Sequence, residues 1–153
     1  MPLVLLAFTL SACSELGFEH PDRIGVLSDG RGNLVVMYRT CRGDTEVTRV
    51  RLLDASGTRG NGADDRTLWA ISGTGHPEAR RFVVGQTPDG FRQEELSSEM
   101  LGAGHLLRVT VESSALPQGE SAFFTMMQLG QDRLRVGEGY QSMEDFVRGN
   151  ACG

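Results

Sequence analysis

The sequence predicts an all-β domain, an antiparallel sandwich or barrel of about seven or eight short strands with one short C-terminal helix. Short apolar runs recur along the chain about every ten residues, with turn residues between them. The chain has 20 glycines and 5 prolines, a balance that suits many tight turns. Between the apolar runs we find no amphipathic segment of ten or more residues, such as the crossover helix that joins two parallel strands.

The first two strands are expected to form a hairpin. Residues 24–27 and 34–38 are apolar, and the segment between them contains the pairs Asp29-Gly30 and Gly32-Asn33. Such pairs between two apolar runs are typical of a tight hairpin turn, because glycine and asparagine tolerate positive φ angles.

The next strand is expected within residues 45–53. There Val50 and Leu52 alternate with Arg49 and Arg51. Because successive side chains of a strand point to opposite faces, this pattern predicts one buried and one charged face.

The remaining elements follow the same pattern. Residues 55–65 are rich in small and polar types and predict a surface loop, and residues 88–91 predict a turn whose Phe91 packs back on the sheet. Residues 92–101 fit either a strand or a helical turn. Further strands are expected at residues 68–71, 81–84, 106–111, 122–129 and 134–136.

A short helix is expected at the C-terminus. Ser142 followed three residues later by Asp145 has the form of a capping box, and Gly149 offers a stop. Phe146 and its apolar neighbours would lie on one side of this helix.

Length and composition indicate one soluble globular domain. The chain has 153 residues, of which 39% are hydrophobic and 23% charged. Its net charge is −5, and all 15 basic residues are arginines scattered among acidic ones. Nucleic-acid binding needs a clustered basic surface, so we exclude nucleic acid as a partner.

The first residues predict export. Residues 3–10 form an apolar run that is too short to span a bilayer and fits the core of a signal peptide. The run leads into Leu10-Ser11-Ala12-Cys13, which resembles the lipobox of bacterial lipoproteins. The resemblance implies that the sulfur of Cys13 receives a diacylglyceryl group and that the chain is cleaved before it.

We therefore expect a signal peptide over residues 1–12, a lipid-anchored tether over 13–22 and a single β-rich domain over 23–153. The expected location is the extracytoplasmic face of the cell membrane, held there by acyl chains that each contribute about 0.8 kcal/mol per buried CH₂. The alternatives are a plain secretory signal, with the protein secreted, or an N-terminal core strand over residues 3–10.

Two cysteines remain in the mature chain, Cys41 and Cys152. An even pair in an exported protein predicts a disulfide. The bridge would close a loop of roughly 110 residues, for which the chain-entropy estimate is almost 5 kcal/mol. The alternative is two unpaired buried thiols.

The sequence contains no convincing catalytic or metal site. His20, His76 and His105 lie far apart, with none of the close spacings typical of zinc sites, so neither a metal nor another cofactor is expected. A G-x-S-x-G nucleophile turn is also missing. If the protein is a hydrolase, His76 or His105 would be the base, within reach of a serine and an acid.

Three residues are weak candidates for binding. Trp69 follows the long loop, and loops at one end of a sandwich often form its binding surface. Asp64 and Asp65 end that loop and could attract a cation, although solvated charge is the simpler interpretation.

The mature chain has, in order, Arg23-Ile24-Gly25-Val26, Cys41 after the second strand, Thr67-Leu68-Trp69, the turn Pro88-Asp89-Gly90-Phe91 and a terminal helix followed by Cys152. This order of motifs resembles small uncharacterised exported proteins of actinobacteria, from which no functional residue carries over. We therefore expect a lipid-anchored extracytoplasmic binding or interaction module, with an unknown protein or small-molecule partner and no catalytic activity. The alternatives are a small exported hydrolase and an accessory subunit of an envelope assembly.

Overall fold

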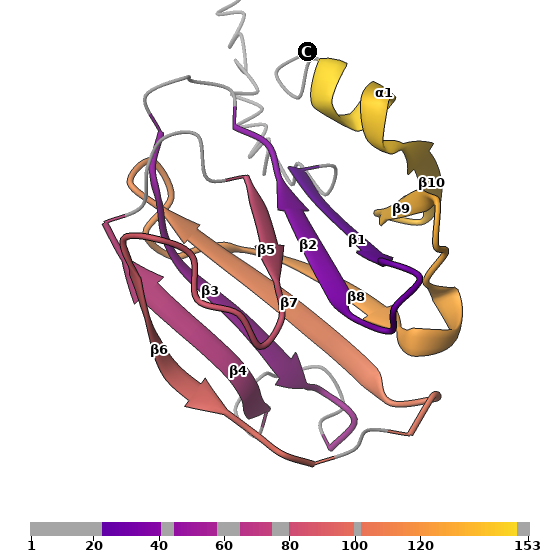
Figure 1. The fold of residues 1–153 in the computed structure, drawn as a ribbon, viewed down its shortest axis with the longest axis horizontal. Coiled ribbons are helices and arrows are strands. Elements are labelled where there is room, and N and C mark those ends of the chain that lie inside the picture. The colour runs from indigo at the N-terminus through magenta and orange to yellow at the C-terminus, as the bar shows by residue number, and fades with distance from the viewer. Residues whose placement is uncertain (1–22, 41–44, 58–64, 75–79, 100–101, 150–153) are drawn as a thin grey trace, which may run out of the picture.

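The described part of the chain forms a β-sandwich of two antiparallel sheets with five strands each, followed by one short helix (Figure 1). The computed structural model describes residues 23–40, 45–57, 65–74, 80–99 and 102–149. The predicted signal peptide, the tether and Cys41 and Cys152 lie outside these ranges. Between residues 23 and 149, the expected all-β fold is confirmed, and neither sheet closes into a barrel.

The first sheet, which we call sheet A, has the strand order β10-β9-β1-β2-β5. Its strands are β1 (Ile24–Ser28), β2 (Leu34–Tyr38), β5 (Arg81–Val83), β9 (Arg133–Val136) and β10 (Gly139–Ser142). The β1–β2 hairpin is confirmed, with Ser28 opposite Leu34. Gly30 and Gly32 in its turn have φ angles of 73° and 87°, which glycine adopts without strain.

The second sheet, sheet B, has the strand order β6-β4-β3-β7-β8. Its strands are β3 (Val47–Asp54), β4 (Arg66–Gly73), β6 (Phe91–Leu96), β7 (Leu106–Ser113) and β8 (Glu120–Thr125). The chain crosses between the sheets after β2, β4, β5 and β8, so each sheet combines strands from distant parts of the sequence.

The main core lies between the sheets. On β3, Val50 and Leu52 are buried while Arg49 and Arg51 are partly exposed, as their alternation predicts. On β7 the buried apolar residues alternate in the same way, and they are Leu107, Val109 and Val111. The largest core side chains, which come from both sheets, are Trp69, Tyr38, Phe82 and Phe124.

The outer faces of the two sheets differ. Sheet B carries ion pairs on its outer face, including Arg49 with Glu94 at 2.6 Å and Arg51 with Glu112 at 2.9 Å. Sheet A carries a second apolar cluster, in which the strand residues pack with Phe146 of the helix. The strand residues of this cluster are Leu27, Val35, Met37, Val83, Leu134 and Val136.

Helix α1 (Met143–Arg148) brings Phe146 to the outer face of sheet A. Its cap is as predicted: the Ser142 hydroxyl accepts a hydrogen bond from the Asp145 amide, and Gly149 ends the helix. Phe146 lies against Gly25, where an added Cβ would be 3.3 Å from its ring. Glycine at position 25 therefore lets the aromatic ring approach the backbone of β1.

One end of the sandwich is closed by polar side chains. The hydroxyl of Tyr38, at the end of β2, donates to the Glu120 carboxylate of β8 at 2.8 Å. Arg23 lies 3.5 Å from the same carboxylate. Burial raises the pKa of Tyr38, and the bond to Glu120 raises it further, so the hydroxyl stays protonated as donor.

The strand count differs from the expectation of seven or eight. Edge strand β6 begins at Phe91 and covers residues 92–96 of the ambiguous segment, and β10 pairs with β9 where no strand was expected. Apolar residues 122–129 end as a strand at Thr125 and continue as the 3-10 helix η2 (Met126–Gln128). Phe91 packs on Phe82 as expected, with ring centroids 5.6 Å apart.

We predict that Phe146→Ala destabilises the protein by about 3–5 kcal/mol, because it leaves a cavity over Gly25 in a site that is 1% exposed. Val147→Ala, on the neighbouring residue that is 66% exposed, should change stability by less than about 0.5 kcal/mol. The measurement is urea unfolding followed by circular dichroism. Equal effects of the two substitutions would show that α1 is not packed on sheet A.

Candidate functional site

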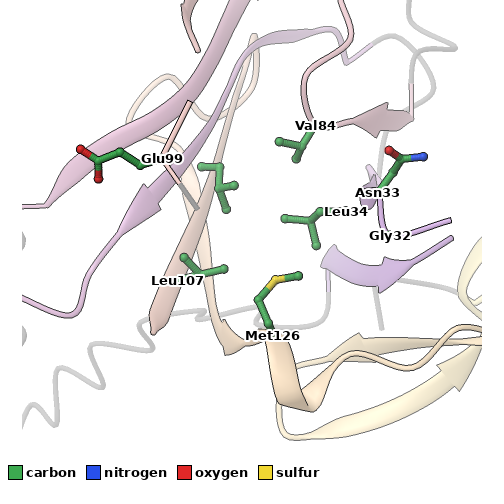
Figure 2. Close-up of a pocket in the computed structure, with 8 residues that line it drawn as sticks. Gly32, Asn33, Leu34, Val84, Glu99, Leu107 and Met126 are labelled. Atoms are coloured by element: carbon green, nitrogen blue, oxygen red, sulfur yellow. The ribbon is translucent and has the colours of Figure 1, made fainter. Parts of the chain in front are cut away.

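A pocket opens between the two sheets at the end of the sandwich opposite the Tyr38–Glu120 bond (Figure 2). Its volume is about 290 Å³. Sheet A contributes Leu34, and sheet B contributes Leu52 and Leu107. The other lining residues come from connections between strands, and they are Gly32, Asn33, Val84, Glu99 and Met126.

The hydrocarbon lining follows from the alternation that builds the core. Leu34 is the first residue of β2, Leu52 lies near the end of β3, and Leu107 lies near the start of β7. All three point inward, and their exposed fractions are 6%, 5% and 1%. The pocket is therefore an extension of the apolar core to the surface.

The side-chain amide of Asn33 and the carboxylate of Glu99 point away from the cavity (Figure 2). The Asn33 amide donates to the Asp29 carboxylate at 2.7 Å. The Glu99 carboxylate is bonded to the Arg66 guanidinium. Both side-chain groups already have partners outside the pocket, so its surface is mainly aliphatic side chains and the Met126 thioether, together with some polar atoms.

Asp29 organises the hairpin at the edge of the pocket. One of its carboxylate oxygens accepts the backbone amides of Arg31 at 2.9 Å and Asn33 at 3.0 Å. The hydrogen bond from the Asn33 side chain, with these two amides, holds the pKa of Asp29 below its ordinary value. The carboxylate is thus used to shape the turn.

A polar network lies beside the pocket. Arg66, which bonds Glu99, also contacts Asp54 at the end of β3, and His105 contacts the same Asp54 oxygen. The two distances to that oxygen, from the Arg66 guanidinium and from His105 Nδ1, are both 3.3 Å. Burial alone would raise the pKa of Asp54, but hydrogen bonds from Ser56 and His105 outweigh it and lower the pKa.

This network contains the acid and the base of the hydrolase alternative. His105 Nδ1 reaches Asp54, while the Ser56 hydroxyl accepts a hydrogen bond from the Leu106 amide at 2.9 Å. The serine therefore fastens the end of β3 to the start of β7. His76, the other candidate base, lies outside the described ranges.

The sequence offers Trp69 and the acidic pair Asp64 and Asp65 as candidates for binding. Trp69 is fully buried, and it lies opposite Leu52 in the β3–β4 register, so it is part of the core. Asp65 pairs with Arg108 at 2.7 Å, and its side chain is only 2% exposed, so it is not a solvated charge. Asp64 lies outside the described residues, as do Cys13, Cys41 and Cys152.

Metal ligands do not gather in the described residues: no group of three or more histidine, cysteine or acidic side chains is placed to hold an ion there. In the same part of the chain, no helix is long and apolar enough to cross a membrane.

Sequence reasoning identified the strands that carry the pocket residues but not the pocket itself. Leu34, Leu52 and Leu107 have the same signature as any inward-facing strand residue. Whether such residues pack tightly or leave a cavity depends on the spacing of the two sheets, which a single sequence does not reveal.

Comparison of the chain with family models, curated proteins and solved structures finds no match.

We predict that Asp54 stabilises the fold above its ordinary pKa of 3.8, because its pKa is lower in the folded state. This stabilisation should be lost as the pH falls through the folded-state pKa, when the carboxyl becomes protonated. The measurement is the free energy of unfolding as a function of pH for the wild type and Asp54→Asn. The variant should lose less stability than the wild type at acidic pH, and parallel curves would contradict the prediction.

Proposed function

We propose that the chain is an exported lipoprotein that presents a non-catalytic binding module on the outer side of the cytoplasmic membrane. The observation that carries the proposal is the position of the pocket, which opens at the end of the sandwich away from Arg23, the first described residue. The lipobox-like segment from Leu10 to Cys13 supplies the expected anchor.

The opposite positions of Arg23 and of the pocket, at the two ends of β1 and β2, support this arrangement. Arg23 precedes β1 and lies at the Glu120 end, whereas Gly32 and Asn33 line the pocket at the other end. The five residues of β2 span about 17 Å between these ends. A domain held through Arg23 would therefore point its pocket away from the membrane.

The chemistry of the pocket supports binding over catalysis. Its polar side chains, Asn33 and Glu99, are held by Asp29 and Arg66 and do not point into it. General acid–base or nucleophilic chemistry needs a polar group within hydrogen-bond reach of the reacting atom. An aliphatic pocket instead gains affinity from the apolar surface that it removes from water.

The contacts of α1 support the predicted disulfide, which belongs with an oxidising location. The Arg39 guanidinium, just after β2, donates to the Phe146 carbonyl at 3.2 Å and lies over the Phe146 ring. It also lies against Gly149, where an added Cβ would be 2.5 Å away. Cys41 is two residues from Arg39 and Cys152 three from Gly149, so spans of about 7 and 11 Å suffice to bring them together.

The membrane anchor makes the first prediction of this proposal. Cys13→Ser should abolish labelling by a palmitate analogue and move the protein from the membrane fraction to the soluble fraction, because the acylated sulfur is lost. The test is fractionation of cells that express each form with its own leader. Cys41→Ser is the matched control and should remain in the membrane fraction. An unlabelled wild type, or membrane attachment that survives Cys13→Ser, would contradict the anchor.

The disulfide between Cys41 and Cys152 gives the second prediction of this proposal. Cys152→Ser should destabilise the oxidised protein by about 2–5 kcal/mol and should have no effect in the presence of reductant. The measurements are denaturant unfolding and the number of thiols that react with a maleimide reagent under denaturing conditions. Reaction of both Cys41 and Cys152 in unreduced wild-type protein would show that the bridge does not form.

A further inference from the structure

We propose that the pocket between the sheets binds the hydrocarbon chain of an uncharged, single-chain amphiphile that is free in the aqueous phase. This inference rests on the proposed function, because it names the class of ligand that the binding module takes. It follows from the lining, the volume and the position of the pocket.

The lining selects an aliphatic chain. Leu34, Leu52 and Leu107 form walls from both sheets, and Val84 and Met126 add further aliphatic groups and a thioether. The set includes no aromatic ring on which a planar ligand would stack. The thioether side chain of Met126 is flexible and adapts to the shape of an apolar ligand.

The volume selects one chain of moderate length. The volume is about 290 Å³ in a pocket that is open to solvent. A space of this size accommodates a stretch of one alkyl chain and not the two long chains of a bilayer lipid.

The absence of an unpaired charge among the described residues that line the pocket favours a ligand with an uncharged head group. Glu99 is the charged residue of the lining set, and the Arg66 guanidinium already neutralises it. An ionic head group therefore meets no free opposite charge at Glu99, and leaving water would cost it free energy. A hydroxyl or ester head remains hydrated at the mouth without that cost.

The position of the pocket favours a ligand that is dissolved in water over a lipid of the membrane that holds the anchor. The pocket opens beside Gly32 and Asn33, at the end of β1 and β2 that is remote from Arg23. A chain tethered before Arg23 has its pocket mouth turned to the aqueous side. The ligand must then reach the pocket through water, as a single-chain amphiphile does more readily than a diacyl lipid.

The binding test uses the full 153-residue chain with Cys13→Ser, so that it does not depend on the anchor. Trp69 is the single tryptophan and lies opposite Leu52, and its fluorescence therefore reports on the pocket wall. We would titrate the protein with butanol, hexanol, octanol and decanol and confirm each affinity by calorimetry. Affinity should rise about fourfold per methylene and level off when the pocket is full.

Three results would overturn the ligand class. They are an absence of binding by every alcohol, an affinity that does not change with chain length, and binding of toluene as tight as that of octanol. Sodium octanoate tests the head group: it should bind at least about tenfold more weakly than octanol, and equal binding would overturn the uncharged head.

A pair of adjacent substitutions tests the site. Met126 lines the pocket, whereas Met127 is 73% exposed and does not line it. Met126→Glu should weaken octanol binding at least about tenfold, because a carboxylate would enter the apolar lining. Met127→Glu should bind as the wild type does. Equal effects of the two substitutions would overturn the site.

Val84→Thr is a second variant that keeps the shape of the side chain while adding a hydroxyl to the lining. It keeps the test decisive if Met126→Glu does not fold, as judged by circular dichroism. Val84→Thr should weaken octanol binding severalfold without a change in the chain-length dependence, and unchanged affinity would overturn the site.

A last comparison distinguishes a ligand that is free in water from a lipid of the bilayer. It also shows whether the ligand class or the membrane anchor is wrong, if one of them is. Acylated wild-type protein in phosphatidylglycerol vesicles should bind octanol as tightly as the unacylated chain does. Much weaker binding there would show that bilayer lipid occupies the pocket and would overturn the free ligand. Membrane attachment without alcohol binding would overturn the ligand class alone, and alcohol binding without attachment would overturn the anchor alone.

Discussion

The structure depends on the packing of two apolar sheet faces against each other. Strands of both sheets present inward residues of the types valine, leucine, isoleucine and aromatic, and the central ones are fully removed from water. The ladder hydrogen bonds set the spacing along each sheet, but the burial of this interior supplies the main driving force. The pocket lies at one end of this interior, where the inward pattern reaches Leu34 and Leu107.

The two ends of the interior have different chemistry. At the end near Arg23, Tyr38 and Glu120 form a hydrogen bond between the sheets, and Arg23 balances the carboxylate. At the other end, the polar groups of Asn33 and Glu99 are held outside the cavity by their own partners. The polar contacts lie at one end of the sandwich and the largely apolar pocket lies at the other. The expected anchor precedes Arg23 at the polar end, so the pocket lies at the end remote from it.

Much of the fold could be predicted from the sequence, since the fold follows from local patterns. The alternation around Val50 and Leu52, the turn at Asp29-Gly30 and the cap at Ser142 each have a local physical cause, and all three are present in the structure. Strand β6 was ambiguous because its residues are almost all exposed at a sheet edge, so burial imposes no alternation on them. Strand β10 was missed because Gly139-Tyr140-Gln141 has no apolar pattern, and pairing with β9 alone defines it.

The candidate site was not predictable in the same way. Trp69 attracted attention as an aromatic residue after a long loop, yet its strand places it in the core. Asp65 was expected in solvent and instead pairs with Arg108. Both errors have the same cause: a residue's distance from a loop in sequence does not determine which face of a twisted sheet it occupies. The pocket, in turn, depends on the separation of two sheets whose strands come from across the whole chain.

The most direct measurement of the central claim is an NMR experiment on protein labelled with ¹³C at methyl groups, in the presence of unlabelled octanol. The account predicts magnetisation transfer from the alkyl protons of octanol to the methyl groups of Leu34, Leu107 and Met126, with none to Met127. Transfer to Met127 and other exposed methyl groups, without transfer to Leu107, would contradict it.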